Sequence, residues 1–280
     1  MNIQLSNIRD DITLAVKTAL QEDIGSGDIT AELIPVDKSD KATVITREDC
    51  IVCGTAWVDE TFHQIDPAVQ LHWKVKDGDK AKANSTLVEL NGNTRSLLTG
   101  ERTALNFLQL LSGTATKAHE FKETLGNSHI QLLDTRKTIP GLRTAQKYAV
   151  NTGGCHNHRI GLFDAFLIKE NHIAGCGGIT QAVDKAKELY PGKLVEVEVE
   201  TIEELKEALN AKVDIVMLDN FSEENLEAAG KLKTAGVKYE VSGNIQRDGL
   251  KEYKSHSIDF ISLGTLTKHV KAVDLSLRIQ

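Results

Sequence analysis

The stretch KLVEVEVETIEELKEALNAKVDIVMLDN, residues 193–220, decides the fold of this chain. Valine alternates with glutamate over 193–199, which predicts a strand, and 213–219 predicts a second strand. The segment between them, 201–210, is predicted to be a helix. Two consecutive strands joined by one helix run parallel, because the connection crosses from one end of the sheet to the other. The stretch therefore predicts an α/β domain built on a parallel sheet.

The same alternation continues on both sides of this stretch. We predict strands at 130–134, 164–169, 193–199, 213–219, 237–242 and 258–263. We predict helices near 141–150, 180–189, 201–210, 222–235 and 246–254. The strands end in LLDT, LIKEN, EVEVE, MLDN, VSGN and SLGT, all of them polar. Strand ends form the active-site face of an α/β barrel, so six polar ends in succession favour a catalytic barrel over a doubly wound sheet. The GCGG at 175–178 also lacks the spacing of a dinucleotide-binding turn.

The first part of the chain has a different pattern. Residues 7–22 predict an amphipathic helix, and a loop rich in glycine follows it. Short strands are predicted within 41–95, in ATVITRED, IVCGTAWV, VQLHWKV and STLVELNG, with a turn at Asp77-Gly78. A helical pattern returns over 99–125, where Gly113 can separate two helices. These patterns predict a small, mainly β region before the barrel.

Composition excludes several classes of protein. The 280 residues carry a net charge of -7, with 40% hydrophobic and 26% charged residues, as in an ordinary soluble protein. No apolar run approaches the ~20 residues of a membrane span, and the amino terminus does not resemble a signal peptide, so we expect a cytoplasmic location. The four cysteines include one isolated CxxC at 50–53. Without a second matched pair, free thiols are expected rather than a zinc site.

Basic side chains gather in one segment of this acidic chain, DTRKTIPGLRTAQKYAVNTGGCHNHRIGLFDAFLIKENHI, residues 134–173. Its cations are Arg136, Lys137, Arg143, Lys147, Arg159 and Lys169. A nucleic-acid site would normally make a whole domain basic, so a local cluster favours a pocket for a small polyanion. Arginine supplies forked pairing to carboxylate or phosphate, and lysine supplies a point charge. A solvated charged face is the alternative, but the interleaved Gly, Pro and His residues count against it.

Acids and glycines occupy the other strand ends. Glu196, Glu198 and Glu200 alternate with valine, so we expect all three on one face of their strand, with Asp219 at the next strand end. Such carboxylates suit Mg²⁺ held beside substrate phosphates, although one of them can instead pair with the basic cluster. Ser242-Gly243-Asn244 and Leu263-Gly264-Thr265 follow late strands, where backbone N–H groups often bind a phosphate.

Several long motifs resemble those of the quinolinate phosphoribosyltransferase family, the carboxylating nicotinate-nucleotide pyrophosphorylases. They are DTRKTIPGLR, GGCHNHRIGLFDAFLIKENHI, EVEVE, MLDN, VSGNI and SLGTLTKHVKAVDLSLRI, with EDIGSGDIT and GERTALNFLQLLSGTAT nearer the amino terminus. The resemblance implies an α/β protein with an N-terminal α/β sandwich domain and an open, incomplete parallel α/β barrel of the type II phosphoribosyltransferase kind. We place these domains at 1–113 and 114–270, with 271–280 packing back on the first.

The resemblance also implies the activity. It implies a pentosyltransferase that joins quinolinate to phosphoribosyl pyrophosphate, giving nicotinate mononucleotide, pyrophosphate and CO₂ in NAD biosynthesis. It implies Mg²⁺ with phosphoribosyl pyrophosphate, no organic cofactor, and no nucleic-acid or membrane partner. It further implies a homodimer whose active sites are shared between subunits, with a higher assembly left open.

Site residues are carried over by motif. The carboxylates of quinolinate would be bound by Arg102, Thr135, Arg136, Lys137, His158, Arg159 and Lys169. Glu198 and Asp219 would serve the ribose and Mg²⁺, and with Lys137 they form the expected catalytic set. Ser242, Gly243, Asn244, Leu263, Gly264 and Thr265 would hold the 5′-phosphate. The choice between Glu198 and Glu200 depends on strand register alone, and Thr265 stands where the family often has a smaller residue.

Three alternatives are open from the residues. A relative on the same fold could use nicotinate or another anionic acceptor without decarboxylation, although the number of cations favours two carboxylates. VKDGDKAKANSTLVEL, residues 75–90, resembles half of a lipoyl-type carrier, but no second half is evident. Lys169 could form a Schiff base, but this requires a neutral amine, which surrounding acids disfavour.

Overall fold

The computed structural model describes residues 3–280, which fall into two compact units. The first unit, here called the barrel unit, contains residues 121–136 and 156–264. The second, here called the sandwich unit, contains the described residues up to 120 together with 137–155 and 265–280. The chain therefore passes between the units several times, and two of these crossings fall next to predicted site residues, at Arg136 and Gly264.

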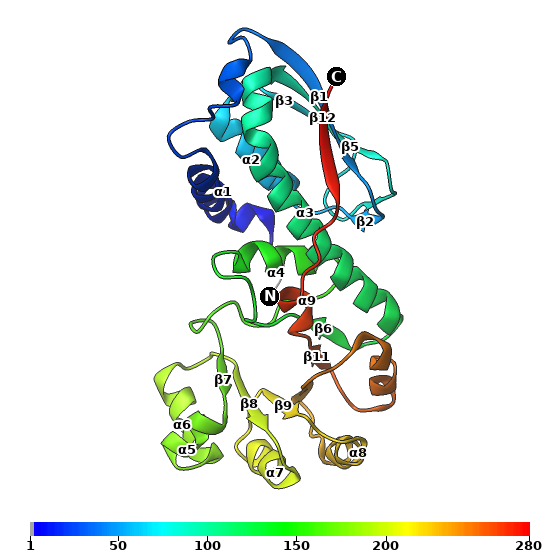
Figure 1. Cartoon of the computed structure of the whole chain (residues 1–280). Helices are drawn as coiled ribbons and strands as arrows, with labels where there is room; N and C mark the ends of the chain where they lie inside the picture. Colours follow the sequence, from blue (N-terminus) through cyan, green and yellow to red (C-terminus); the bar gives the residue numbers. More distant parts are fainter. Residues whose placement is uncertain (1–2) are drawn as a thin grey trace. The chain divides into compact units, whose positions relative to one another are not determined.

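The barrel unit is built on one six-stranded sheet, in the order β6-β11-β10-β9-β8-β7 (Figure 1). Its strands are β6 (Gln131–Leu133), β7 (Phe166–Ile168), β8 (Val195–Val199), β9 (Ile215–Asp219), β10 (Lys238–Ser242) and β11 (Phe260–Ser262). Each neighbouring pair is parallel, with Glu198 opposite Met217 and Ser242 opposite Asp219. Among the described residues β6 and β7 do not pair, so the barrel is open between them. All six predicted strands and the predicted fold class are confirmed.

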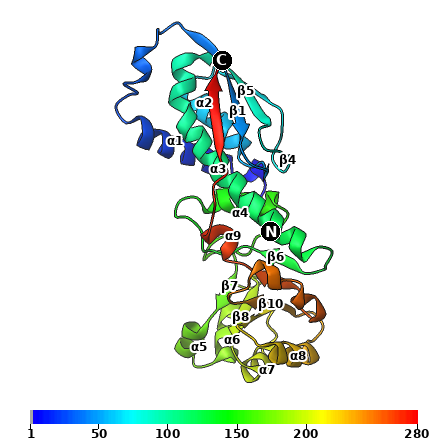
Figure 2. The same ribbon diagram turned by 45° about the vertical axis from the view of Figure 1, so that its right-hand side comes forward.

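Helices cover the outside of this sheet, as both ribbon views show (Figures 1 and 2). They are α5 (Glu170–Cys176), α6 (Ile179–Leu189), α7 (Ile202–Asn210) and α8 (Glu223–Leu232). The start of α7 is fixed by a capping box, in which Thr201 Oγ1 accepts the Glu204 N–H and the Glu204 carboxylate accepts the Thr201 N–H. Buried apolar residues such as Val183, Leu205 and Leu226 face the sheet. The helices therefore occupy one side of the strands and leave the other side for polar groups.

The sandwich unit contains an antiparallel sheet in the order β12-β1-β5-β3. Its strands are β1 (Ser39–Thr46), β3 (Gln70–Trp73), β5 (Thr86–Asn93) and β12 (Leu275–Ile279), and β2 (Cys50–Ile51) pairs separately with β4 (Lys80–Ala81). Because β12 pairs with β1, the last residues of the chain complete the sheet formed by the first part. Val44, Leu87 and Leu90 contribute to the core under this sheet.

Helices complete the sandwich unit. They are α1 (Arg9–Ile24), α2 (Thr55–Ile65), α3 (Thr94–Leu125), α4 (Arg143–Thr152) and α9 (Thr265–Lys268); the last residues of α3 belong to the barrel unit. A second core joins Val16 of α1, Trp57 of α2, Leu111 of α3 and Ala149 of α4. No described helix combines the length and apolarity needed to cross a membrane. The four cysteines form no disulfide in the described structure; Cys50, Cys53 and Cys155 are buried, and Cys176 is exposed.

Three local predictions are wrong. The segment IVCGTAWV is not one strand, because Gly54 (φ 113°) turns the chain and Asp77 Oδ1 accepts the N–H groups of Gly54 and Thr55, which starts α2. Gly113 does not interrupt α3. A Cβ there would lie 2.1 Å from the Lys271 carbonyl oxygen. This glycine therefore lets the chain at Lys271 pack closely against an uninterrupted helix. The predicted helix at 246–254 is replaced by two short 3-10 turns, at Arg247–Gly249 and Glu252–Ser255.

Candidate active site

Polar side chains gather at the carboxyl ends of the barrel strands. Thr135 and Arg136 follow β6, Lys169 follows β7, and Asp219 and Ser242 end β9 and β10. Because all six strands run parallel, these ends lie along one edge of the sheet. The loop after β6 and the segment from 156 are joined there, since Leu133 forms a parallel bridge with His156. The structure therefore brings the predicted barrel residues to one edge.

His158 is held by acids inside the barrel. Its Nε2 atom lies 3.0 Å from Glu196 Oε2 and 3.4 Å from Glu240 Oε2. Its backbone N–H donates to Asp134 Oδ1 over 2.9 Å, and its Nδ1 atom accepts the Arg159 N–H over 2.7 Å. Glu196 is 3% exposed and Glu240 is fully buried, so two carboxylates are withdrawn from water around one imidazole.

This cluster retains a proton above neutral pH. Burial alone would lower the pKa of His158, but hydrogen bonds and charge from Glu196 and Glu240 outweigh it and raise the pKa to about 10. Burial, reinforced by the like charge of Glu240, raises the pKa of Glu196 to about 7. At neutral pH the ring therefore carries a proton on Nε2, the nitrogen that faces the two carboxylates.

Two guanidinium groups lie beside the cluster. Burial and the nearby charge of Arg136 lower the pKa of Arg159. Arg159 Nη1 donates to the carbonyl of Ala165 over 3.3 Å, and the buried Nε atom of Arg136 has no hydrogen-bond partner. Like charges held together in a partly buried place destabilise each other until an anion joins them. An anion with two carboxylates would satisfy both groups through forked pairing.

Lys169 and Glu198 form an ion pair across the β7 and β8 strand ends. The Lys169 side chain is 40% exposed and that of Glu198 is 11% exposed, so the pair lies at the mouth of the barrel. An ammonium paired with a carboxylate is a poor amine nucleophile, which counts against a Schiff base. The prediction that Glu200 lies in the same strand as Glu196 and Glu198 is wrong. Glu200 lies beyond β8, is exposed, and its N–H donates to the Glu204 carboxylate at the start of α7.

Asp219, Asn220 and Gly243 form a second polar group at the β9 and β10 ends. Asn220 Nδ2 donates to Asp219 Oδ2 over 2.8 Å, and the Asn220 N–H donates to the Ser242 carbonyl over 3.1 Å. Asn220 (φ 53°) and Gly243 (φ 106°) both have positive φ angles. A Cβ on Gly243 would lie only 2.2 Å from Asn220 Oδ1, so only glycine lets the two strand ends approach this closely.

The remaining predicted residues are divided between the units. Leu263 and Gly264 end the barrel unit, and the Leu263 N–H donates to the Leu133 carbonyl over 2.8 Å. Arg102, Lys137 and Thr265 belong to the sandwich unit, where Arg102 is exposed on α3 and the Lys137 carbonyl accepts the Thr267 hydroxyl over 2.8 Å.

Sequence reasoning missed two buried acids of this site, Glu240 and Asp134, and misplaced a third, Glu196. Glu240 lies between Tyr239 and Val241, and an acid in the middle of an otherwise apolar strand was the available signal. Glu196 was expected at the strand end, yet it lies deeper and contacts His158. Asp134 is fully buried and accepts hydrogen bonds from the Asn157 side chain, over 2.6 Å, and from the His158 backbone.

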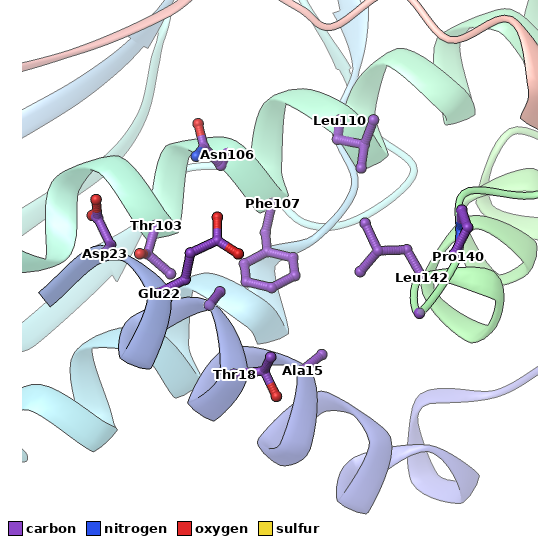
Figure 3. A pocket seen from close by; sticks show the side chains of 12 residues that line it. Ala15, Thr18, Glu22, Asp23, Thr103, Asn106, Phe107, Leu110, Pro140 and Leu142 are labelled. Atoms are coloured by element: carbon purple, nitrogen blue, oxygen red, sulfur yellow. The ribbon is translucent and has the colours of Figure 1, made fainter. Parts of the chain in front are cut away.

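A cavity of about 360 Å³ in the sandwich unit is a poor match for this chemistry (Figure 3). Phe107 of α3 and Leu142 face into it, and α1 contributes Glu22 and Asp23. Its lining contains two carboxylates and no lysine or arginine, so it would repel a polyanion. We therefore place the candidate active site at the strand ends of the barrel unit.

Two sets of side chains offer ligand atoms for a cation. The ligand atoms of His158, Glu196 and Glu240 lie within 4.8 Å of one another. A histidine must give up the proton of the nitrogen that binds a metal, whereas the raised pKa of His158 keeps a proton on Nε2 between the two acids, so this set does not fit a metal. Glu198 and Asp219 offer carboxylate oxygens near the barrel mouth, and these fit a loosely held Mg²⁺ that also binds substrate.

The open barrel with charged side chains at its strand ends defines an α/β-barrel enzyme, and comparison with known proteins agrees with this fold. The family models for the N-terminal and C-terminal domains of quinolinate phosphoribosyl transferase match residues 28–112 and 114–278. The chain belongs to the quinolinate phosphoribosyltransferase family, as its motifs predicted.

Individual relatives match over nearly their whole length. A structure of the nicotinate-nucleotide pyrophosphorylase from Francisella tularensis is 52% identical, with a TM-score of 0.93, covering 97% of this chain and 96% of that one. A probable carboxylating nicotinate-nucleotide pyrophosphorylase of Bacillus subtilis is 42% identical over 259 residues, 92% of this chain and 90% of the relative. The corresponding protein of Methanocaldococcus jannaschii is 40% identical over 283 residues, 97% and 98% of the two chains.

Proposed function

We propose that this protein transfers the phosphoribosyl group of phosphoribosyl pyrophosphate to quinolinate, with decarboxylation. The products are nicotinate mononucleotide, pyrophosphate and CO₂, in NAD biosynthesis. The observation that carries the proposal is the match of both family domains over residues 28–112 and 114–278. The two adjacent guanidinium groups of Arg136 and Arg159 support it, because they suit a substrate with two carboxylates.

The pyridine dicarboxylate is proposed to bind at the cationic side of the edge. Arg136 and Arg159 pair with its carboxylates, and Thr135, His158 and Lys169 complete the barrel part of this site. We assign Lys137 and Arg102, from the sandwich unit, to the same substrate on the basis of their motifs. A substrate with one carboxylate would leave a desolvated guanidinium without a partner, which costs about 1–3 kcal/mol. Nicotinate should therefore be a poor substrate.

The phosphoribosyl group is proposed to bind at the opposite side of the edge. The backbone of Ser242-Gly243-Asn244 and of Leu263-Gly264-Thr265 would hold the 5′-phosphate, and Glu198 and Asp219 would face the ribose. The same two acids would hold Mg²⁺, partly through the substrate, and the ion would neutralise charge on the departing pyrophosphate.

The chemistry follows from the charges of the side chains. Loss of pyrophosphate leaves positive charge on the sugar, and the carboxylates of Glu198 and Asp219 stabilise it. The pyridine nitrogen then attacks the sugar carbon, and the ring becomes cationic. The cationic ring stabilises the electron pair left on its carbon when the adjacent carboxylate departs as CO₂, and a proton from solvent then forms the new C–H bond of nicotinate mononucleotide. The arginines and Lys137 orient the reactants, and such positioning can lower a barrier by several kcal/mol.

One assay tests the proposed function. Carbon dioxide labelled in the 2-carboxylate should be released from quinolinate only when phosphoribosyl pyrophosphate and Mg²⁺ are both present. Nicotinate should have a kcat/KM lower by about fivefold or more, because leaving one guanidinium without its carboxylate costs about 1–3 kcal/mol. Equal kcat/KM values for the two acids would instead favour a relative that acts without decarboxylation.

We also propose a homodimer in which Arg102 serves the active site of the partner subunit. The sequence motif around Arg102 supports this role, and its side chain is exposed on α3. Arg102→Ala and Arg159→Ala should each be nearly inactive. When equal amounts are unfolded and refolded together, about half of the dimers are mixed, and one site in each mixed dimer is intact. Activity should therefore return to roughly a quarter of the wild-type value. Activity that stays flat while mixed dimers are present would place Arg102 in its own subunit's site.

A further inference from the structure

We propose that Glu196 and Glu240 are positioning residues, which fix the imidazole of His158 through its Nε2–H and thereby set the place of Arg159. This inference rests on the proposed function, because it assigns Arg159 to a carboxylate of the substrate. It adds two buried acids to the residues that the sequence motifs assign to the site.

Contacts at both ring nitrogens and at the backbone constrain the orientation of His158. The backbone N–H is held by Asp134, Nδ1 accepts the Arg159 N–H, and Nε2 faces Glu196 at 3.0 Å and Glu240 at 3.4 Å. A ring fixed at both nitrogens and at its own backbone cannot turn without breaking at least one contact. Because the Nδ1 contact is to the backbone of the next residue, the ring orientation is coupled directly to Arg159.

The acids come from the rigid part of the fold. Glu196 lies in β8 and Glu240 in β10, the neighbours of the central strand β9. Their side chains are 4% and 0% exposed. Glu196 Oε1 and Glu240 Oε1 are buried without a hydrogen-bond partner, and the contact of Glu240 Oε2 with Nε2 of His158, at 3.4 Å, is an ion pair rather than a hydrogen bond. Buried charges of this kind are rarely favourable for stability, and apolar residues of similar volume are often tolerated better. Positioning of His158 explains why these two sites carry acids.

Charged groups from every side face the cluster. Asp134, from the end of β6, binds the backbone of His158, and Arg159 attracts the Glu196 carboxylate. Arg159 is also influenced by Arg136 and Asp164. Asp164 in turn accepts the N–H groups of Ile160 and Gly161 over 2.6 and 3.1 Å, which holds the chain just after Arg159. The backbone is therefore held on both sides of Arg159. The acid cluster holds His158 before it, and Asp164 holds Ile160 and Gly161 after it.

Matched variants test the hydrogen bond rather than the charge. Glu196→Gln keeps an acceptor for the Nε2–H, whereas Glu196→Leu removes it with a similar volume. We expect Glu196→Leu to raise the KM for quinolinate at least tenfold with the KM for phosphoribosyl pyrophosphate within twofold of wild type. Glu196→Gln should stay within about threefold for both substrates. Glu240→Leu should have a smaller effect than Glu196→Leu, since its contact with His158 is 0.4 Å longer.

Two kinds of result would overturn the positioning role. The first is an equal effect of Glu196→Gln and Glu196→Leu, or an equal change in the KM of both substrates. The second is stoichiometric zinc or manganese in the wild-type protein that is lost in Glu240→Leu, which would indicate a metal site. Failure of the wild-type protein to release CO₂ from quinolinate would instead refute the proposed function.

A second measurement does not depend on the leucine variants folding or on turnover. In ¹⁵N-histidine-labelled wild-type protein, with His158 assigned through His158→Asn, the Nε2 atom should carry a slowly exchanging proton. A proton on Nδ1 with an unprotonated Nε2 would refute the arrangement.

Discussion

Replacement of Gly243 by alanine tests how the two strand ends at the proposed ribose and phosphate site are held together. Gly243 has a φ of 106°, and a Cβ on it would lie 2.2 Å from Asn220 Oδ1 and 3.1 Å from the Asn220 backbone nitrogen. An alanine in such a conformation costs about 1–3 kcal/mol in the backbone alone. The Asn220 side chain would also have to turn away, with loss of its hydrogen bond to the Asp219 carboxylate, worth about 1.5–3 kcal/mol when the acceptor is charged.

The sum gives the expected magnitudes. Because Asn220 is exposed, we take the lower half of each range and expect Gly243→Ala to lower the free energy of unfolding by about 2.5–4 kcal/mol. Displacement of Asp219 should lower kcat/KM for phosphoribosyl pyrophosphate by about 10- to 100-fold, since each 1.4 kcal/mol is a factor of ten. The KM for quinolinate should change little.

Gly192→Ala is the matched control, because Gly192 lies in the same unit at a φ of 83° and a Cβ there would meet nothing within 4 Å. It should show the backbone cost, about 1–3 kcal/mol, and no kinetic change. Urea denaturation and steady-state kinetics with each substrate varied in turn measure both effects. If Gly243→Ala resembles Gly192→Ala in both measurements, the contact with Asn220 does not organise this edge.

Two further tests address charge. Arg136→Lys should lower kcat/KM for quinolinate by at least tenfold although the charge is kept, because a point charge cannot reproduce forked pairing. Near-normal kinetics would make Arg136 peripheral. Burial alone would raise the pKa of Asp259, but hydrogen bonds from Lys233, the Tyr239 N–H and Lys238 hold it below its ordinary value. Its stabilisation is therefore present above the unfolded pKa of about 3.9 and lost as the pH falls through the folded pKa. Asp259→Asn should be about 1–3 kcal/mol less stable at pH 7, and the difference should shrink below pH 4 in acid titrations of unfolding.

The sequence was most informative where local pattern and tertiary structure impose the same conformation. All six barrel strands could be predicted, because each combines apolar residues with a polar end. Prediction failed where a distant residue decides the local structure. Asp77 accepts the N–H groups that start α2, although IVCGTAWV has strand propensity, and the approach of Lys271 explains a glycine inside α3 that sequence alone presents as a break.

For the site, strand alternation identified the edge but not the depth of each acid along it. Alternation places Glu196 and Glu198 on one face of β8, yet their positions differ by two residues of rise, roughly 6–7 Å along the strand. That separation gives them different partners. Glu198 pairs with Lys169 at the mouth of the barrel, where a substrate can displace one of the two partners. Glu196 pairs with His158 in the buried interior. One sequence repeat therefore supplies two kinds of carboxylate: an outer one suited to a reacting sugar, and an inner one suited to holding the residues that bind the acid. The register of β7, β8 and β10 decides which glutamate is the outer carboxylate and which is the inner one, and this register is known only from the folded sheet.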